Sequence, residues 1–133
     1  MAKTLTTSNG QKIKIKNYKT EDDFQIACIR YMQYMHPKVI CIHTPNGGFR
    51  NKREAGKFKR MGVVRGIPDI LIFKAKGGYH GLAIELKINN NRVSPEQKKM
   101  LQRLKDEDWK TEVLWDSLDD FIYVVDDYLG KTL

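Results

Sequence analysis

The sequence lacks the features that mark membrane, secreted and thiolate-metal proteins. No stretch approaches the run of about 20 apolar residues that a membrane helix needs, and residues 1–16 contain no apolar segment of a secretion signal. We therefore expect a cytoplasmic protein without a membrane partner. The two cysteines, Cys28 and Cys41, form no CxxC pair and have apolar neighbours, which favours reduced, buried thiols over a disulfide or a zinc site.

The length and net charge of the chain set the next limits. With 133 residues, of which 41% are hydrophobic, the chain can bury one ordinary core but is too short for two domains of typical size. We expect an N-terminal arm or edge strand over residues 1–19 and a single domain over residues 20–133. The formal net charge of +8 favours a polyanionic partner. Ribosomal, membrane-surface and nuclease proteins are all compatible with this charge.

The positive charge is concentrated in one segment. Between Phe49 and Arg65 stand seven cations against the single anion Glu54, whereas the C-terminal third of the chain is acidic. A solvated helix face is one explanation of such a run. Intrahelical ion pairs explain it poorly, because one anion cannot pair with seven cations. We therefore expect this segment to contact phosphates, with the candidates Arg50, Lys52, Arg53, Lys57, Arg60 and Arg65.

The spacing of apolar residues predicts helices at both ends of the chain and one between them. Apolar residues three and four positions apart predict a first helix, which Thr20 caps and Pro37 ends. We expect the basic segment to form an irregular loop with some helix. A serine cap, a proline at the first helical position and a glutamine at the third position predict a helix after Ser94. A last amphipathic helix is predicted after Ser117.

Strands are predicted between these helices. Residues 39–44 form an apolar run that is typical of a buried strand. Residues 70–73 and 80–88 are expected to pair as a hairpin, because a Gly-Gly turn separates them. A short strand over residues 111–115 follows the middle helix. The order α, β, β, β, α, β, α predicts an α/β fold in which helices flank a mixed central sheet.

One predicted strand carries a carboxylate and an amine on the same face. Side chains alternate along a strand, so Glu85 and Lys87 share the face opposite to the apolar residues 82, 84, 86 and 88. Taken alone, the pair is compatible with a solvent-exposed face that carries an ion pair. The hairpin adds Asp69, because Pro68 suits the first position of a strand and the connection brings Asp69 alongside Glu85. Two carboxylates beside a lysine form a site for a hard divalent cation such as Mg²⁺.

Such a group of side chains suits phosphodiester hydrolysis. The reaction needs an attacking hydroxide and relief of the negative charge that builds on the phosphate, and a divalent metal supplies both. We expect Asp69 and Glu85 to hold the ion. Lys87 is expected to orient the water or to neutralise the phosphoryl oxygens in the transition state.

The same motifs resemble the PD-(D/E)xK nucleases, and their VRR-NUC branch in particular. That branch has an acidic residue and a glutamine in an N-terminal helix, an Asn-Gly-Gly turn, a Gly-(I/V)-Pro-Asp strand, an E-x-K strand and S-x-x-Q at the next helix start. The resemblance covers roughly residues 20–116. The residues of this sequence that match the five motifs are, in order, Glu21 and Gln25, Asn46 to Gly48, Gly66 to Asp69, Glu85 to Lys87, and Ser94 to Gln97.

The resemblance implies a restriction-endonuclease-like fold and a DNA endonuclease that uses Mg²⁺, for which Mn²⁺ substitutes, without an organic cofactor. It implies Asp69, Glu85 and the Leu86 carbonyl as metal ligands and Lys87 as the catalytic lysine, with Glu21 and Gln97 completing the site. Small members of the branch are similar to enzymes that cut branched or flap DNA, including four-way junctions. Such enzymes are usually homodimers, since one site cuts one strand.

Several of these residues have structural explanations as well. The helix dipole favours Glu21 in the first turn of a helix without any metal. Gln97 can complete a capping box with Ser94, although a helix N-terminus facing a phosphate uses the same residues. The turn at Asn46 needs glycine for its conformation, yet glycine also lets a backbone approach DNA closely. We therefore count Asn46 and Ser94 among the candidate DNA contacts.

Other functions are compatible with parts of the sequence. A non-catalytic nucleic-acid-binding module with the same fold would not need the intact set of Asp69, Glu85 and Lys87. A structural component of a basic assembly would explain the charge but not the carboxylates. A sequence-specific restriction nuclease would need a base-reading insertion, and none is evident at this length. Trp109 and Trp115 fit core or helix-packing positions better than base-stacking positions, and the scattered histidines are more often structural than ligands.

Overall fold

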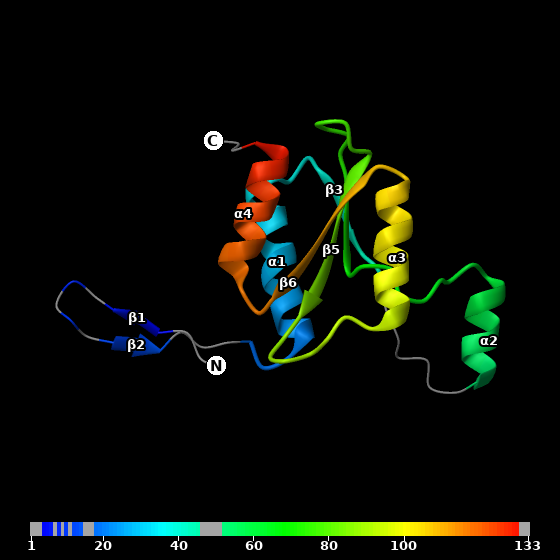
Figure 1. The fold of residues 1–133 in the computed structure, drawn as a ribbon, viewed down its shortest axis with the longest axis horizontal. Coiled ribbons are helices and arrows are strands. Elements are labelled where there is room, and N and C mark those ends of the chain that lie inside the picture. Colours follow the sequence, from blue (N-terminus) through cyan, green and yellow to red (C-terminus); the bar gives the residue numbers. More distant parts are fainter. Residues whose placement is uncertain are drawn as a thin grey trace.

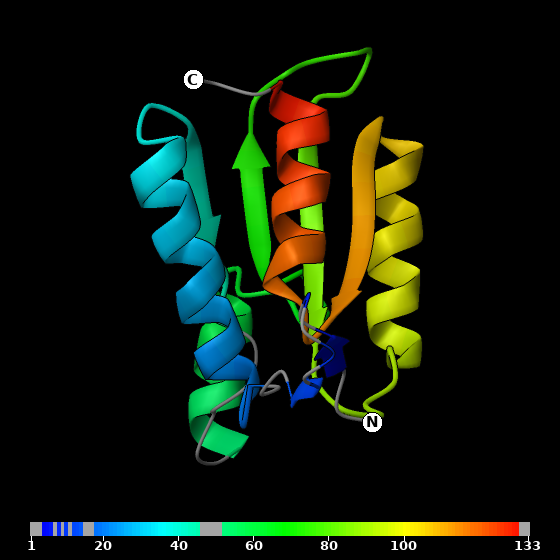
Figure 2. The ribbon, with the colours of Figure 1, turned by 90° about the vertical axis from the view of Figure 1, so that its left-hand side faces the viewer.

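The computed structural model describes residues 4–6, 8, 10, 12–14, 18–45 and 52–130. Figure 1 and Figure 2 show a central sheet with α1 and α4 on one face and α3 on the other. The elements in chain order are β1 (Thr4–Thr6), β2 (Lys12–Lys14), α1 (Glu21–Met35), β3 (Ile40–His43), α2 (Lys52–Arg60), β4 (Ile70–Phe73), β5 (Gly81–Lys87), α3 (Pro95–Asp106), β6 (Trp109–Trp115) and α4 (Leu118–Leu129).

The central sheet is mixed, as the sequence predicts. Its strand order is β3-β4-β5-β6, with antiparallel pairing from β3 to β5 and parallel pairing between β5 and β6. Helix α3 makes the crossover that a parallel pair requires. Strands β1 and β2 pair with each other in a separate two-stranded sheet, so they form an arm and are not an edge of the central sheet.

The helix starts follow from local sequence. Thr20 accepts a hydrogen bond from Asp23 N at 3.0 Å and caps α1. Ser94 and Gln97 form the reciprocal capping box of α3, and Ser117 caps α4. Each cap satisfies a backbone N–H that the first helical turn leaves without a partner. All three caps agree with the sequence prediction.

The hydrophobic core lies between the sheet and the helices α1 and α4. The even-numbered residues of β5, Leu82, Ile84 and Leu86, are buried against it. Phe24 of α1 and Phe121 of α4 cover these strands. The other face of β5 is buried too, because β4, β6 and α3 surround it, and this second face carries Glu85 and Lys87.

The strand that follows α1 is more exposed than predicted. The prediction of a buried strand over residues 39–44 is wrong, because β3 is an edge strand and the side chains of Ile40 and Ile42 are 64% and 42% exposed. Val39 and Cys41 pack against the core on the α1 side. Helix α3 packs against β6 at the opposite edge of the sheet, so it leaves the other face of β3 uncovered.

The two tryptophans of β6 lie in different surroundings. Trp109 is half-buried and meets Phe73 edge-on, with ring centroids 5.5 Å apart. Trp115 is 43% exposed, so of the two positions predicted for it, core or helix-packing, the core position is wrong. Trp115 ends an edge strand, where a neighbouring strand is present on one side only.

The cysteines behave as buried thiols. Cys28 is buried, Cys41 is half-buried, and both are free. Burial raises the pKa of Cys28 and raises that of Cys41 to about 11, so both thiols are protonated near neutral pH. Among the described residues, no helix is both long and apolar enough to span a membrane.

Candidate active site

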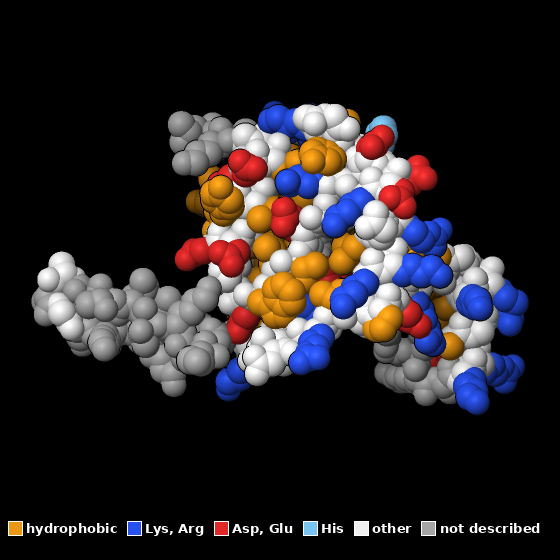
Figure 3. Space-filling view, in the orientation of Figure 1, with side chains coloured by type: hydrophobic (Ala, Val, Ile, Leu, Met, Phe, Trp, Pro, Cys, Tyr) orange, Lys and Arg blue, Asp and Glu red, His pale blue; other side chains and the backbone are white. Residues whose placement is uncertain are grey.

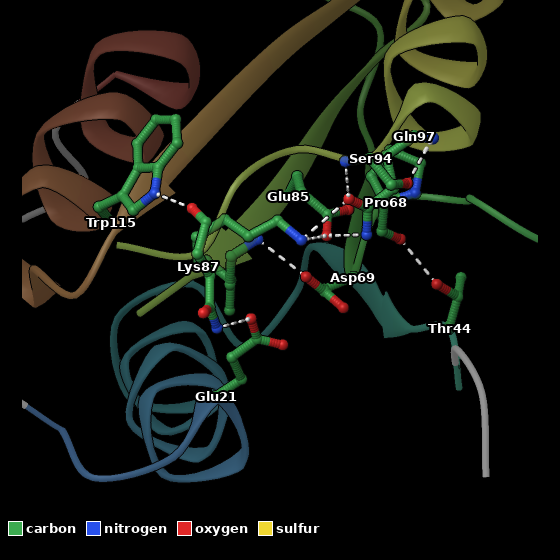
Figure 4. A network of polar contacts seen from close by, with 11 residues as sticks. Glu21, Thr44, Pro68, Asp69, Glu85, Lys87, Ser94, Gln97 and Trp115 are labelled. Carbon is green, nitrogen blue, oxygen red and sulfur yellow. Dashed lines mark hydrogen bonds and ion pairs between the residues drawn. The ribbon is translucent and has the colours of Figure 1, made fainter. Parts of the chain in front are cut away.

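Two carboxylates meet where β4 begins and β5 approaches its end. Ile70 pairs with Ile84 in the antiparallel register, so Asp69 lies alongside Glu85. Asp69 Oδ2 accepts a hydrogen bond from the backbone N–H of Leu86 at 2.8 Å, which fixes the carboxylate against β5. Figure 4 shows Asp69, Glu85 and Lys87 converging. The hairpin therefore brings the two carboxylates together as the sequence predicts.

Glu85 and Lys87 are buried, which excludes the alternative of a solvent-exposed ion pair. Their residues are 2% and 7% exposed, and Lys87 Nζ lies 3.5 Å from Glu85 Oε1. Burial, followed by the charge of Asp69, raises the pKa of Glu85 to about 8, and Lys87 opposes that shift. Glu85 Oε2 is buried and has no hydrogen-bond partner among the described residues. The described residues therefore compensate one oxygen of this buried carboxylate, Oε1, and leave the other without a partner.

Gln97 connects α3 to both charged side chains. Its Oε1 accepts from Lys87 Nζ and from the backbone N–H of Ser94, both at 2.9 Å. Its Nε2 donates to Glu85 Oε1 at 2.9 Å. The capping box and the contact with the charged pair are therefore one arrangement, not alternatives. Ser94 Oγ accepts from Gln97 N at 3.1 Å, so in this structure Ser94 serves as the cap of α3.

The loop before Asp69 is held closely against neighbouring backbone. Gly66 has a φ of +81°, and a Cβ at this position would lie 3.0 Å from the carbonyl oxygen of Glu96 at the start of α3. Thr44 holds the other side, where its Oγ1 donates to the Pro68 carbonyl at 2.6 Å and its N–H donates to the Asp69 carbonyl at 3.0 Å. Glycine in the Gly-Ile-Pro-Asp motif thus permits the approach that positions Asp69.

A cavity of about 290 Å³ opens onto the two carboxylates. Glu21 reaches it from the first turn of α1, and its Oε1 accepts a long hydrogen bond of 3.4 Å from Asn91 Nδ2. Lys87 contacts two of the lining side chains through its ammonium group. The lining residues are Glu21, Asp22, Gln25, His43, Pro45, Asp69, Glu85, Leu86 and Gln97.

His43 is a cavity residue that the sequence analysis did not select. Its Nδ1 lies 2.9 Å from the carbonyl oxygen of Asp69, and because a carbonyl only accepts, Nδ1 carries the proton of this hydrogen bond. The β3–β4 register pairs His43 with Ile70 and so places it beside Asp69. Only this strand pairing reveals the position, since the two residues are 26 apart in sequence.

The oxygen atoms of the site fit a hard divalent cation with few protein ligands. The described part of the chain contains no group of three or more His, Cys, Asp or Glu side chains placed to hold a metal. Mg²⁺ does not require one, because it keeps several waters and uses one or two carboxylates. Glu85 Oε2, which no described residue bonds, and the adjacent Asp69 carboxylate supply such a pair. Asp69, Glu85 and the Leu86 carbonyl are the groups that could hold the ion.

The candidate phosphate contacts lie mainly on α2. Figure 1 shows this helix beyond α3, away from the sheet, and Figure 3 shows Lys and Arg side chains gathered over it. Arg65 follows it and, with Lys59 and Glu96, lines a cavity of about 670 Å³ between α2 and the start of α3. Asn46 and Arg50 lie outside the described residues. The exposed cations of α2 are Lys52, Arg53, Lys57, Lys59 and Arg60.

Comparison with known proteins identifies the family. The family model of the VRR-NUC domain matches residues 19–115. The chain belongs to the VRR-NUC family. A solved structure described as a VRR_NUC domain protein is 33% identical to this VRR-NUC chain, with a TM-score of 0.72 over 88% of this chain and 93% of the other. A search of curated proteins finds no match.

The match covers the whole candidate site of this VRR-NUC domain. Residues 19–115 contain all four strands of the central sheet, together with α1 and α3. The family assignment confirms the resemblance found in the sequence, and the solved structure confirms the mixed α/β fold. The chain therefore carries a nuclease-type domain.

Proposed function

We propose that this VRR-NUC domain is a DNA endonuclease that requires Mg²⁺ and accepts Mn²⁺ in its place. The observation that carries the proposal is the buried Glu85, which lies beside Asp69 and has one oxygen without a partner among the described residues. Burying a carboxylate without full compensation destabilises a protein, so a purely structural role does not explain it. A site that receives a cation and a phosphate does explain it.

Each side chain has a separate role in this proposal. The carboxylates of Asp69 and Glu85, with the Leu86 carbonyl, would hold the ion. When bound, a divalent cation lowers the pKa of a water molecule and acts as a Lewis acid towards the phosphodiester. Lys87 Nζ, held at 2.9 Å by Gln97, would neutralise the charge that develops on the phosphoryl oxygens. Glu21 would orient water from the α1 side of the cavity.

We propose branched or flap DNA as the substrate and a homodimer as the active form. The exposed cations of α2 suit contacts to the phosphate backbone, which position a duplex without reading its sequence. One site cuts one strand, so symmetric incision of a four-way junction requires a second site, which a two-fold partner would supply. Light scattering of the purified protein would give its mass with and without DNA.

Cleavage assays test the proposed activity directly. End-labelled duplex, single-stranded, flap and four-way-junction DNA are incubated with the protein in Mg²⁺, Mn²⁺ or EDTA. We expect cleavage with either metal, none in EDTA, and faster cleavage of the branched or flap substrates. Tight DNA binding without cleavage in any metal would instead support the non-catalytic binding module, and the absence of both binding and cleavage would contradict both functions.

Removing cations from α2 should weaken DNA binding without changing the chemical step. The test is the triple variant Arg53→Ala, Lys57→Ala and Arg60→Ala. The logarithm of the DNA association constant falls linearly with the logarithm of the salt concentration, and each phosphate contact contributes roughly 0.9 to the steepness of that line. We expect the line to be less steep by about 2 to 3 in the variant. The cleavage rate at saturating DNA should stay near that of the wild type. Fluorescence anisotropy between about 50 and 200 mM salt measures the slope.

A double variant at another surface controls for the loss of net charge, with the effects compared per charge removed. Arg103→Ala with Lys105→Ala removes exposed cations from the last turn of α3, at the end of the helix away from Gln97. We expect a smaller change of slope for this variant. If both variants lower the slope by the same amount per charge, α2 is not the phosphate-binding surface.

A further inference from the structure

Trp115 lies beside the candidate active site and is open to solvent. Strands β5 and β6 pair in parallel with Lys87 opposite Trp115, and paired backbones in a sheet are about 5 Å apart. Figure 4 shows Trp115 in the same view as Lys87 and Glu21, at the edge of the group of polar residues. A tryptophan that is 43% exposed gives up much of the stabilisation that burial would provide. An exposed indole at this position, opposite Lys87, is available for contact with a ligand at the site.

The polar edge of the indole is linked through Asn91 to Glu21, which lines the cavity. Trp115 Nε1–H donates to the carbonyl oxygen of Asn91 at 2.8 Å, and Asn91 Nδ2 donates to Glu21 Oε1 at 3.4 Å. The backbone N–H of Asp116 donates to the Lys87 carbonyl at 2.8 Å and keeps the end of β6 against β5. The ring is thus held in a defined place at the end of β6, next to the Lys87 backbone, and part of its surface is exposed.

We propose that Trp115 stacks on an unpaired nucleobase of the DNA strand that enters the candidate active site. The proposal rests on the proposed nuclease function and specifies its substrate. A paired base inside a duplex offers no free face to a side chain, whereas an unpaired base next to a branch does. Stacking is also tolerant of sequence, because every base has a π face, and this agrees with phosphate contacts by α2. Arg92, which follows Asn91 in the loop, is an exposed cation.

A structural role for the indole predicts a different response. In that case Trp115 covers the end of β6 and fixes the loop between β5 and α3 through Asn91. Its surroundings would then not depend on whether DNA carries an unpaired base nearby. The intrinsic fluorescence of the indole distinguishes the two roles, because stacking on a base quenches it.

The Trp109→Phe variant makes Trp115 the single tryptophan, since the chain contains two. In EDTA, this variant is titrated with flap DNA, with the same flap lacking the bases nearest the branch, and with blunt duplex. The fluorescence anisotropy of labelled DNA is used to choose concentrations at which the same fraction of the protein is bound to each of the three DNAs. We expect strong quenching by the intact flap and little by the abasic flap or the duplex. Equal quenching by all three, or none by the intact flap at saturation, would overturn the proposal.

A second comparison does not require the Trp109→Phe variant to fold. If that variant does not fold, the difference in quenching between wild type and Trp115→Phe gives the same signal in the full protein. For cleavage in Mg²⁺, we expect Trp115→Ala to raise KM for the flap roughly 5- to 100-fold with kcat little changed. Trp115→Phe should keep KM near the wild-type value, because phenylalanine can still stack on a base. Phenylalanine cannot donate to Asn91, so a role that depends on this hydrogen bond would not be restored. An equal rise of KM for blunt duplex would assign Trp115 a structural role.

The experiments can reject the stacking of Trp115 without rejecting the nuclease function, and the reverse. The fluorescence titration needs no metal and no cleavage, so it reports stacking even if the chain is only a binding module. Conversely, metal-dependent cleavage without base-dependent quenching would leave the nuclease proposal intact and reject the role of Trp115.

Discussion

The Asp69→Asn variant is expected to bind DNA about as tightly as the wild type and to cleave it at least about a thousandfold more slowly. Asparagine has nearly the shape of aspartate, so its side-chain oxygen can still accept from Leu86 N and hold β4 against β5. The substitution removes the negative charge that would bind the cation beside Glu85. Single-turnover cleavage with saturating protein measures the rate separately from binding.

Two further variants show whether a loss of cleavage in Asp69→Asn reflects the loss of a metal ligand. Asp127→Asn removes an exposed carboxylate from α4 and should cleave at the wild-type rate. Lys87→Met keeps a side chain of similar length but loses the ammonium group. It should lower the rate of DNA cleavage, while calorimetry with Mn²⁺ should still detect metal binding. If Asp69→Asn cleaves within about tenfold of the wild type, Asp69 is not an essential ligand.

The Glu85→Gln variant is expected to lose cleavage and, without metal, to be more stable than the wild type at high pH. The pKa of Glu85 is raised from its ordinary 4.5 to about 8 in the folded chain. The folded state therefore binds this proton more tightly than the unfolded state, and wild-type stability falls as pH rises between these values, then levels off. Glutamine can still accept from Gln97 Nε2 and carries no charge into the buried position.

Chemical denaturation in EDTA at pH 5 and pH 9 tests this expectation. The difference in the free energy of unfolding should be small at pH 5 and reach on the order of a few kcal/mol in favour of the variant at pH 9. Saturating Mg²⁺ should stabilise the wild type but not the variant, because only the wild type binds the ion. Glu107→Gln, at an exposed position, keeps Glu85 and should lose stability with rising pH as the wild type does. A difference that does not vary with pH would contradict the burial of an ionisable Glu85.

Local sequence was sufficient for most of the elements and for the centre of the site. Thr20, Ser94 and Ser117 cap helices because a side-chain oxygen satisfies a free N–H one turn ahead, and this depends on neighbours in the chain alone. The alternation along β5 separates the core residues from Glu85 and Lys87 for the same reason. Asp69 reaches Glu85 because a short hairpin fixes its own register.

The sequence could not reveal which strand lies at an edge. The apolar run of residues 39–44 has the composition of a buried strand, yet β3 has one neighbouring strand and leaves Ile40 and Ile42 exposed. Likewise, Trp115 has the character of a core residue but lies half open at the end of an edge strand. Exposure depends on what the rest of the chain places beside a residue, and a local pattern does not contain that information.

The sequence by itself determined the family, the order of the elements and the pairing of Asp69 with Glu85, because caps, alternation and hairpins act over short distances. Only the tertiary structure decided that His43 lies beside Asp69, that Gln97 bonds Lys87 and Glu85 at once, and that Trp115 borders the site. These contacts join segments that are 10 to 28 residues apart, or meet across strands, and their geometry follows from sheet order and helix packing, which the whole chain sets together.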